Sequence, residues 1–240
     1  GDKISELCRA CAPALQNLIH AEETEEELPL LAMMERGEEE ATATAELIDT
    51  TLIEQLPSRY QDGVKQSAML LGFFSNKEGM NYAPVFTALL GSVDEAARAL
   101  ITRTLIDSLP ATVAEQKAWF DPYLQDVDRR THRHYQGMAQ NLKRTLVFKN
   151  GISPVGLLRS CLDYALNDKT KLGGVFEAVT EGFKVGGARD LLAQVESVND
   201  FRNTYVAHHE KDLTDRQTAE KALKEWVACL ATIHRFESSG

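Results

Sequence analysis

The chain of 240 residues is 43% hydrophobic and 26% charged, a composition typical of a globular protein rather than a disordered one. Its formal net charge of −10 excludes a protein that coats nucleic acid through a uniformly basic surface. No apolar run approaches the roughly 18–20 residues that span a bilayer, and the N-terminus carries no secretory signal, so we expect no membrane partner and a cytoplasmic location. Because the chain begins without an initiator Met, we expect it to be part of a larger parent protein.

The first third of the chain predicts helices around an acidic segment. Apolar residues at helical spacing predict helices over 3–20 and 38–56, the second ended by Pro57. Cys8 and Cys11 lie in the first of these, and no second Cys or His pair completes a zinc site, so we expect buried thiols and no metal or cofactor. Residues 22–40 hold nine Glu against one Arg. Such a segment is usually a solvated face; the alternative is an acidic mimic of nucleic acid.

Further helices follow up to the middle of the chain. Residues 63–72 are helical in pattern, and Ser92-x-x-Glu95 predicts a capping box that opens a helix to about residue 109. Pro110 stops that helix and is the expected boundary between an N-terminal helical region, 1–110, and a C-terminal helical domain, 111–240. Thr112-x-x-Glu115 predicts a second capping box, followed by a long helical region interrupted near Asp121-Pro122 and resuming to about residue 148.

A basic stretch runs from residue 129 to residue 149, which contains Arg and Lys but no acid. A patch of one sign can meet the phosphates of a nucleic acid, although such a face is more often only solvated surface. His132 and His134, with Asp128, suggest a metal site, but the neighbouring arginines would repel a cation, so none is expected there. The residues expected to bind RNA are Arg129, Arg130, Arg133, Lys143, Arg144 and, beyond this stretch, His209.

The last third predicts helices only. Shorter helices are expected over 154–166 and 173–183, and Gly186-Gly187 precedes a strongly amphipathic helix. Thr214-x-x-Gln217 is expected to cap the final helix. No stretch shows the strict alternation of a β-strand, so the fold class is an all-α helical bundle. The apolar stripe of the amphipathic helix is Leu191, Val195, Val198, Phe201 and Tyr205, and that of the final helix is Ala219, Leu223, Trp226, Leu230 and Ile233.

Polar residues with matched chemistry end the amphipathic helix. Arg202, Asn203 and His208 are not needed for the core, because the apolar stripe already supplies it. Arg presents a planar fork of donors to phosphate oxygens, and His can give or take a proton near neutral pH. Asn can orient a hydroxyl, a phosphate or the His. Since an RNA strand brings its own 2′-OH nucleophile, such a set could cleave RNA without a metal. The bland alternative is a pair of cations that satisfy a helix C-terminus.

This arrangement resembles the HEPN superfamily, whose signature is Arg, a polar residue and then His, between the last two long helices of an all-α domain. The resemblance covers roughly the second half of the chain. Arg202 and Asn203 match, and five residues separate Arg202 from His208. The commonest spacing in the family is four, which would select Ala207; spacings of five and six select His208 and His209, and we choose His208.

The resemblance implies a metal-independent endoribonuclease that leaves a 2′,3′-cyclic phosphate and acts as a homodimer on single-stranded RNA. In that scheme Arg202 binds the phosphate, Asn203 orients, His208 transfers a proton, and no cofactor takes part. The parent protein would serve in defence or stress. The alternative is a catalytically silent HEPN-like module for dimerisation or docking, carried by a larger helicase or restriction-type protein.

Overall fold

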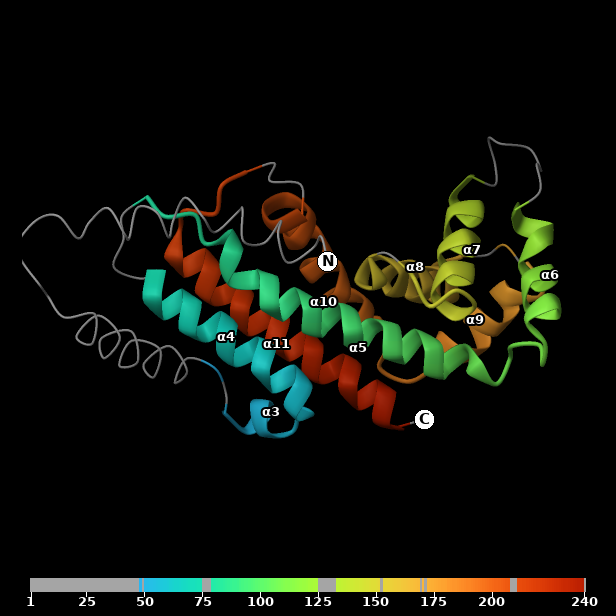
Figure 1. Ribbon diagram of the computed structural model, residues 1–240, viewed down its shortest axis with the longest axis horizontal. Coiled ribbons are helices and arrows are strands. Elements are labelled where there is room, and N and C mark those ends of the chain that lie inside the picture. Colours follow the sequence, from blue (N-terminus) through green and yellow to red (C-terminus); the bar gives the residue numbers. More distant parts are fainter. Residues whose placement is uncertain are drawn as a thin grey trace, which may run out of the picture. The chain divides into compact units, whose positions relative to one another are not determined.

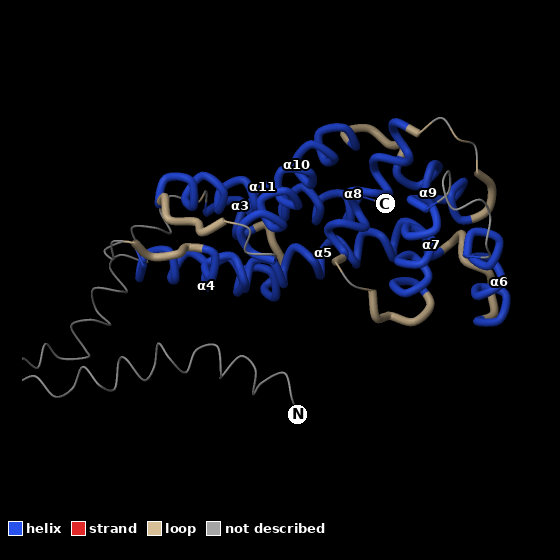
Figure 2. The backbone as a smooth tube through the Cα atoms, turned by 90° about the horizontal axis from the view of Figure 1, so that it is seen from above, coloured by secondary structure: helices blue, strands red, loops and turns tan. Residues whose placement is uncertain are grey.

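The chain folds into helices throughout the part that the structure describes. The computed structural model describes residues 48, 50–74, 79–124, 133–151, 153–168, 170, 172–207 and 211–239. Every regular element within these ranges is helical (Figure 2), so the expected all-α class is confirmed. None of these helices combines the length and the apolar character that a bilayer crossing needs. The expected helix over 3–20, the two cysteines in it and the acidic segment 22–40 lie outside the described residues.

The described helices follow one another along the chain in the order that the colours of Figure 1 show. The earlier elements are α3 (Thr50–Glu54), α4 (Ser58–Phe74), the 3-10 turn η2 (Ala83–Val85), α5 (Phe86–Ile106) and α6 (Val113–Leu124). The later ones are α7 (Arg133–Leu146), α8 (Pro154–Asn167), α9 (Val175–Phe183), α10 (Ala188–Phe201), the π-helical turn η3 (Arg202–Ala207) and α11 (Arg216–Ser239).

The long helices α4, α5 and α11 lie side by side (Figures 1 and 2). The approach of α4 to α5 depends on a glycine. A Cβ on Gly63 would collide with the Ser92 hydroxyl and would lie 3.0 Å from the carbonyl oxygen of Ala88. A side chain at residue 63 would therefore force the two helices apart.

The start of α5 corrects one expectation. α5 begins at Phe86, directly after η2, in which Pro84 occupies the first turn where a missing N–H costs nothing. Ser92 consequently lies inside the helix and is buried, and the Glu95 carboxylate lies 3.3 Å from Nε of Arg59 instead of capping a helix end. The expected capping box at this place is wrong, because the helix was already formed one turn and more before it.

The second capping box is confirmed at the start of α6. The Thr112 backbone N–H donates to the Glu115 carboxylate at 3.1 Å, and the Glu115 N–H donates to the Thr112 hydroxyl at 3.2 Å. The interruption expected near Asp121-Pro122 is misplaced, since α6 includes Pro122 and ends at Leu124. A proline in the last turn removes only one hydrogen bond, which a helix end tolerates.

The final helix begins one residue later than the expected cap allows. Asp215 caps α11, because its carboxylate accepts the backbone N–H of Thr218 at 2.8 Å, and the expected cap at Thr214 is wrong. The Thr218 hydroxyl donates to the same carboxylate, and the two hydrogen bonds from Thr218 lower the pKa of Asp215. All five residues of the expected apolar stripe of α11 are buried, at most 1% exposed.

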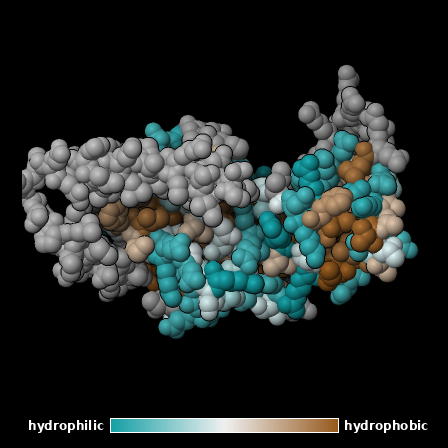
Figure 3. Space-filling view, in the orientation of Figure 1, coloured by the Kyte–Doolittle hydropathy of each residue, from teal (hydrophilic) through white to brown (hydrophobic). Residues whose placement is uncertain are grey.

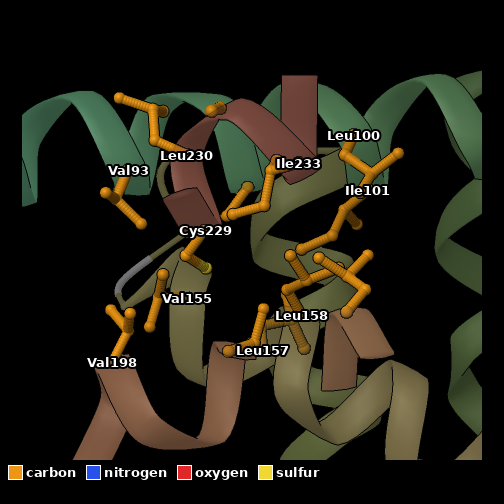
Figure 4. Close-up of a cluster of buried hydrophobic side chains, with 14 of the residues drawn as sticks. Val93, Leu100, Ile101, Val155, Leu157, Leu158, Val198, Cys229, Leu230 and Ile233 are labelled. Carbon is orange, nitrogen blue, oxygen red and sulfur yellow. The ribbon is translucent and has the colours of Figure 1, made fainter. Parts of the chain in front are cut away.

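One hydrophobic cluster joins helices from both sides of Pro110. Side chains of α5 meet those of α8, α10 and α11 (Figure 4), and all of them are at most 4% exposed. The boundary expected at Pro110 stays a prediction about folding units, while packing continues across it. The labelled side chains are Val93, Leu100, Ile101, Val155, Leu157, Leu158, Val198, Cys229, Leu230 and Ile233.

Candidate functional site

The Arg202-Asn203 pair lies where the amphipathic helix changes its hydrogen-bonding pattern. α10 ends at Phe201 and the chain continues in the π-helical turn η3. Such turns are rare and occur frequently at functional sites. Aromatic contacts fix this one to the core: the Phe201 ring centroid lies 4.8 Å from that of Phe86 and 4.9 Å from that of Tyr205. The turn is therefore held in place while Arg202 and Asn203 stay half-buried.

The Arg202 guanidinium is anchored on one of its three nitrogens. Nη1 donates to the Ser153 hydroxyl at 3.1 Å and to the Asn203 carboxamide oxygen at 3.2 Å. Nε is buried without a hydrogen-bond partner among the described residues, and no described side chain accepts from Nη2. A buried donor without a partner is costly, of order 1–3 kcal/mol. A guanidinium with such an unpartnered donor suits an anionic oxygen acceptor, of the kind that a bound phosphate would supply.

Ser153 holds Arg202 from an unusual backbone conformation. Its φ is 50°, in the left-handed region, and it directly precedes Pro154, the first residue of α8. Although Ser153 is the N-cap residue, its hydroxyl makes no capping hydrogen bond. The Asp94 carboxylate takes that role by accepting the backbone N–H of Val155 at 3.1 Å. The Ser153 hydroxyl is thus released for Arg202, at the expense of a strained backbone of the kind that clusters at functional sites.

These residues form one wall of a cleft of about 560 Å³. Arg202 is its only charged lining residue among those described, and the polar remainder is neutral. A Cβ on Gly156 would lie 3.0 Å from the Ser153 hydroxyl oxygen and 3.4 Å from the Asn199 carboxamide oxygen, so the missing side chain keeps these two oxygens open to the cleft. The lining residues are Gly137, Met138, Asn141, Ser153, Gly156, Leu157, Ser160, Asn199, Arg202 and Asn203.

Asp94 is a largely buried carboxyl that interacts with Arg202. Burial raises the pKa of its carboxyl, while the Val155 N–H and the positive charges of Arg202 and Arg98 act in the opposite direction. Arg98 in turn donates to the carbonyl oxygen of Gly151 at 3.3 Å. One carboxylate therefore ties α5 to the start of α8 and lies close enough to Arg202 to attract it.

The structure brings two of the three expected catalytic residues together. Arg202 and Asn203 share a hydrogen bond and line the same cleft. His208 and His209 lie outside the described residues, so the choice between them stays a prediction.

The expected RNA-binding residues divide into three groups. Arg129, Arg130 and the side chain of Arg133 lie outside the described part of the chain, as do the side chains of His132 and His134. Lys143 does not line the cleft and pairs with Asp121, with its ammonium nitrogen 3.0 Å from the carboxylate. Arg144 makes no ion pair with a described residue and follows the cleft residue Asn141 by one helical turn, so it shares that face of α7.

The sequence did not reveal the uncharged polar residues that line this cleft beside Arg202 and Asn203. Asn199 lies three residues before Arg202 in α10 and is 6% exposed, and a buried Asn within an apolar helix face was the signal that could have found it. Ser153, Asn141 and Ser160 carried no such signal, because only the packing of α7, α8 and α10 brings them to Arg202.

No cluster of three or more His, Cys, Asp or Glu side chains suited to a metal ion occurs among the described residues. Comparison of the chain with family models, curated proteins and solved structures gave no match. The side chains of the cleft therefore carry the functional proposal.

Proposed function

We propose that this chain is a metal-independent endoribonuclease of the HEPN type, with its active site in the cleft at Arg202. One observation carries the proposal: Arg202, anchored through Nη1 and with a buried Nε that has no hydrogen-bond partner among the described residues, lines a cleft that no described carboxylate lines. A phosphodiester is a ligand whose charge and geometry fit a guanidinium.

The chemistry balances without a metal. The ribose 2′-oxygen attacks the adjacent phosphorus and loses its proton to a base, the bond to the 5′-oxygen breaks, and an acid protonates that leaving oxygen. The products are a 2′,3′-cyclic phosphate and a 5′-hydroxyl. Arg202 stabilises the charge that develops on the phosphoryl oxygens, and Asn203 orients Arg202 through its carboxamide oxygen.

Proton transfer in this proposal belongs to His208. A single imidazole cannot be base and acid in the same step, so a second His from a second copy of the chain completes the site across a two-fold axis. Arg144, on the cleft face of α7, guides the RNA backbone, whereas Lys143 is committed to Asp121.

The test is cleavage of single-stranded RNA in EDTA. We expect Arg202→Ala to slow cleavage by at least about 100-fold, the usual effect of removing one transition-state donor, and His208→Ala to do the same. Arg189→Ala is the matched control, since Arg189 is an exposed arginine on the same helix α10 that does not line the cleft. A 2′-deoxy substrate should be inert because it lacks the nucleophile. Cleavage by Arg202→Ala at the wild-type rate would refute the assignment.

A second candidate function, a silent dimerisation module, is favoured by an apolar surface. Hydrophobic side chains gather over α6, α7 and α9 on the face in Figure 3. Val113 at the start of α6 is 58% exposed and Phe148 after α7 is 48% exposed, with the Lys117 ammonium 5.7 Å from the Phe148 ring centroid. A second copy of this chain would bury this surface.

RNA cleavage, measured together with sedimentation, separates this candidate from the first, because both require a dimer. If dimerisation is the function, Phe148→Glu should yield monomers, and Arg202→Ala should sediment as the wild type does without any RNA being cleaved by either protein. A wild-type chain that stays monomeric at micromolar concentration would refute the dimerisation function.

A further inference from the structure

Asn199 is a nearly buried residue of α10 whose carboxamide makes no hydrogen bond to a described residue and lines the cleft. It is 6% exposed and lies beside Val198, which is 1% exposed, on the inner face of α10. Its side chain lines the cleft, and its oxygen faces Gly156, where a missing Cβ leaves room. A helix face built for packing alone would carry an apolar residue such as Leu or Val here, because a polar amide gains nothing from an apolar neighbourhood.

The groups around Asn199 are donors and acceptors without charge. The Asn203 carboxamide oxygen accepts a hydrogen bond from Arg202, so the amino group of Asn203 can donate to another acceptor. The Ser160 hydroxyl donates to the carbonyl oxygen of Gly156 at 3.0 Å, which leaves its lone pairs as acceptors. Asn141 adds a third amide from α7. Neutral groups of this kind recognise a polar, uncharged ligand by its pattern of donors and acceptors.

Nucleobases are such ligands. A carboxamide places one donor next to one acceptor, the pattern that pairs in two hydrogen bonds with a base edge. In single-stranded RNA the bases are unstacked and their edges are accessible to protein amides. The Arg202 guanidinium, three residues further along the chain, lines the same cleft and would bind the phosphate that accompanies each base in RNA. The volume of about 560 Å³ lies in the usual range of a small-molecule site, about 300–1,000 Å³, and accommodates one nucleotide.

We propose that the cleft is a nucleotide-selective subsite, in which Asn199, with Asn141 beside it, reads the edge of one RNA base next to the phosphate held by Arg202. This rests on the proposed function for its ligand, RNA, and it adds base selectivity to a site otherwise directed at the RNA backbone. Asn199 acts here as a specificity-determining residue and takes no part in proton transfer.

Binding, rather than cleavage, tests the proposal. The probes are fluorescent 2′-O-methyl octamers of adenine, cytosine or uracil alone, whose blocked 2′-oxygen cannot attack, with anisotropy measured at one fixed salt concentration. The wild-type affinities should differ between bases by roughly 5-fold to 150-fold, the discrimination that one bidentate contact supplies. Asn199→Leu, similar in size, should bring the three affinities within about two-fold of each other, and a thermal midpoint close to that of the wild type will show that the fold is kept.

Gln194→Leu is the matched control. Gln194 lies on the same helix and its carboxamide oxygen is buried without a partner among the described residues, but it lines a separate hollow with Arg235 and Phe236. This variant should keep the wild-type selectivity. Equal affinity of the wild type for all three octamers, or unchanged selectivity in Asn199→Leu, would overturn the proposal. A nucleoside monophosphate that displaces the octamers at equal concentration would overturn RNA as the source of the nucleotide. Selective binding by a chain that cleaves no RNA would refute the nuclease and leave the subsite standing.

Discussion

Lys149 and Ser153 stand on either side of the break between α7 and α8, each with a left-handed backbone, φ 53° and 50°. A non-glycine residue pays of order 1 kcal/mol for this conformation. We expect Lys149→Gly to raise the free energy of unfolding by up to about 1 kcal/mol without affecting RNA cleavage. Ser153→Gly should gain similar stability but slow cleavage, because Arg202 loses the hydroxyl that anchors Nη1. Urea unfolding and RNA cleavage, measured on the same preparations, check both expectations.

Ser153→Ala separates the two roles of that residue. It keeps the strained backbone and removes only the hydroxyl, so cleavage should fall as in Ser153→Gly while the stability gain is absent. Wild-type cleavage by both Ser153 variants would show that the Arg202 contact does not position the guanidinium.

Asp94 gives a prediction with a defined pH dependence. Burial raises its pKa above the ordinary value of 3.8, so ionisation of this carboxyl opposes folding above the raised pKa and ceases to do so below 3.8. Asp94→Asn keeps an oxygen that can accept the Val155 N–H. We therefore expect the variant to be more stable than the wild type at pH 7, with the difference vanishing as the pH falls below 3.8. Thermal midpoints from pH 3 to pH 8 measure this. A less stable variant at pH 7 would mean that attraction to Arg202 and Arg98 outweighs burial.

At the scale of elements, alanine substitutions at two glycines of the helix pair α4 and α5 should change the free energy of unfolding in opposite directions. Gly63→Ala should lower the free energy of unfolding by about 1–3 kcal/mol, because the new methyl group meets the Ser92 hydroxyl and the Ala88 carbonyl oxygen. Gly91→Ala, in the exposed interior of α5 with nothing within 4 Å of its Cβ, should raise it by about 0.5–1 kcal/mol. Urea unfolding curves measure both. A neutral Gly63→Ala would show that the helices can separate without cost.

The same elements show what local patterns can and cannot predict. Helical periodicity found the amphipathic helix and the buried stripe of α11, because burial imposes that period wherever a helix covers a core. Helix starts were less predictable. Thr112-x-x-Glu115 caps α6, whereas Ser92-x-x-Glu95 has the same pattern but packs against Gly63 inside α5. A capping box is a local signal, and contacts between helices decide whether the residues are free to use it.

For the whole molecule, the sequence indicated the site only in part. Arg202 and Asn203 are neighbours in the chain and were recognised from their chemistry. Their partner Ser153 is distant in sequence, and so is Asn141, so the cleft exists only after α8 has packed against both α7 and α10. The Ser153 hydroxyl is available to Arg202 because Asp94 of α5 caps α8 in its place, by accepting the Val155 N–H. Local sequence patterns do not predict these linked contacts, because each of them joins two different helices.

Two buried thiols can report whether the described helices unfold as one unit. Cys161 of α8 and Cys229 of α11 are both buried, and Figure 4 shows Cys229 within the hydrophobic cluster. Burial raises the pKa of both thiols, that of Cys229 to about 12. The thiolate is the reactive form, so neither should react with a disulfide reagent at pH 8 in the folded protein. In a variant with Cys8→Ser and Cys11→Ser, we expect labelling to rise with urea along the same curve as the loss of helical circular dichroism.

This coincidence tests the expected boundary at Pro110 as well. α5 precedes Pro110 and packs against both α8 and α11, so its departure would uncover the cluster that encloses the two thiols. If residues up to 110 formed a separate folding unit, part of the helical signal would be lost at a urea concentration different from that of labelling. A single transition shared by both measurements would instead place α4, α5 and the helices of the cleft in one cooperative unit, because the hydrophobic contacts across Pro110 would then be lost together with the Arg202 site.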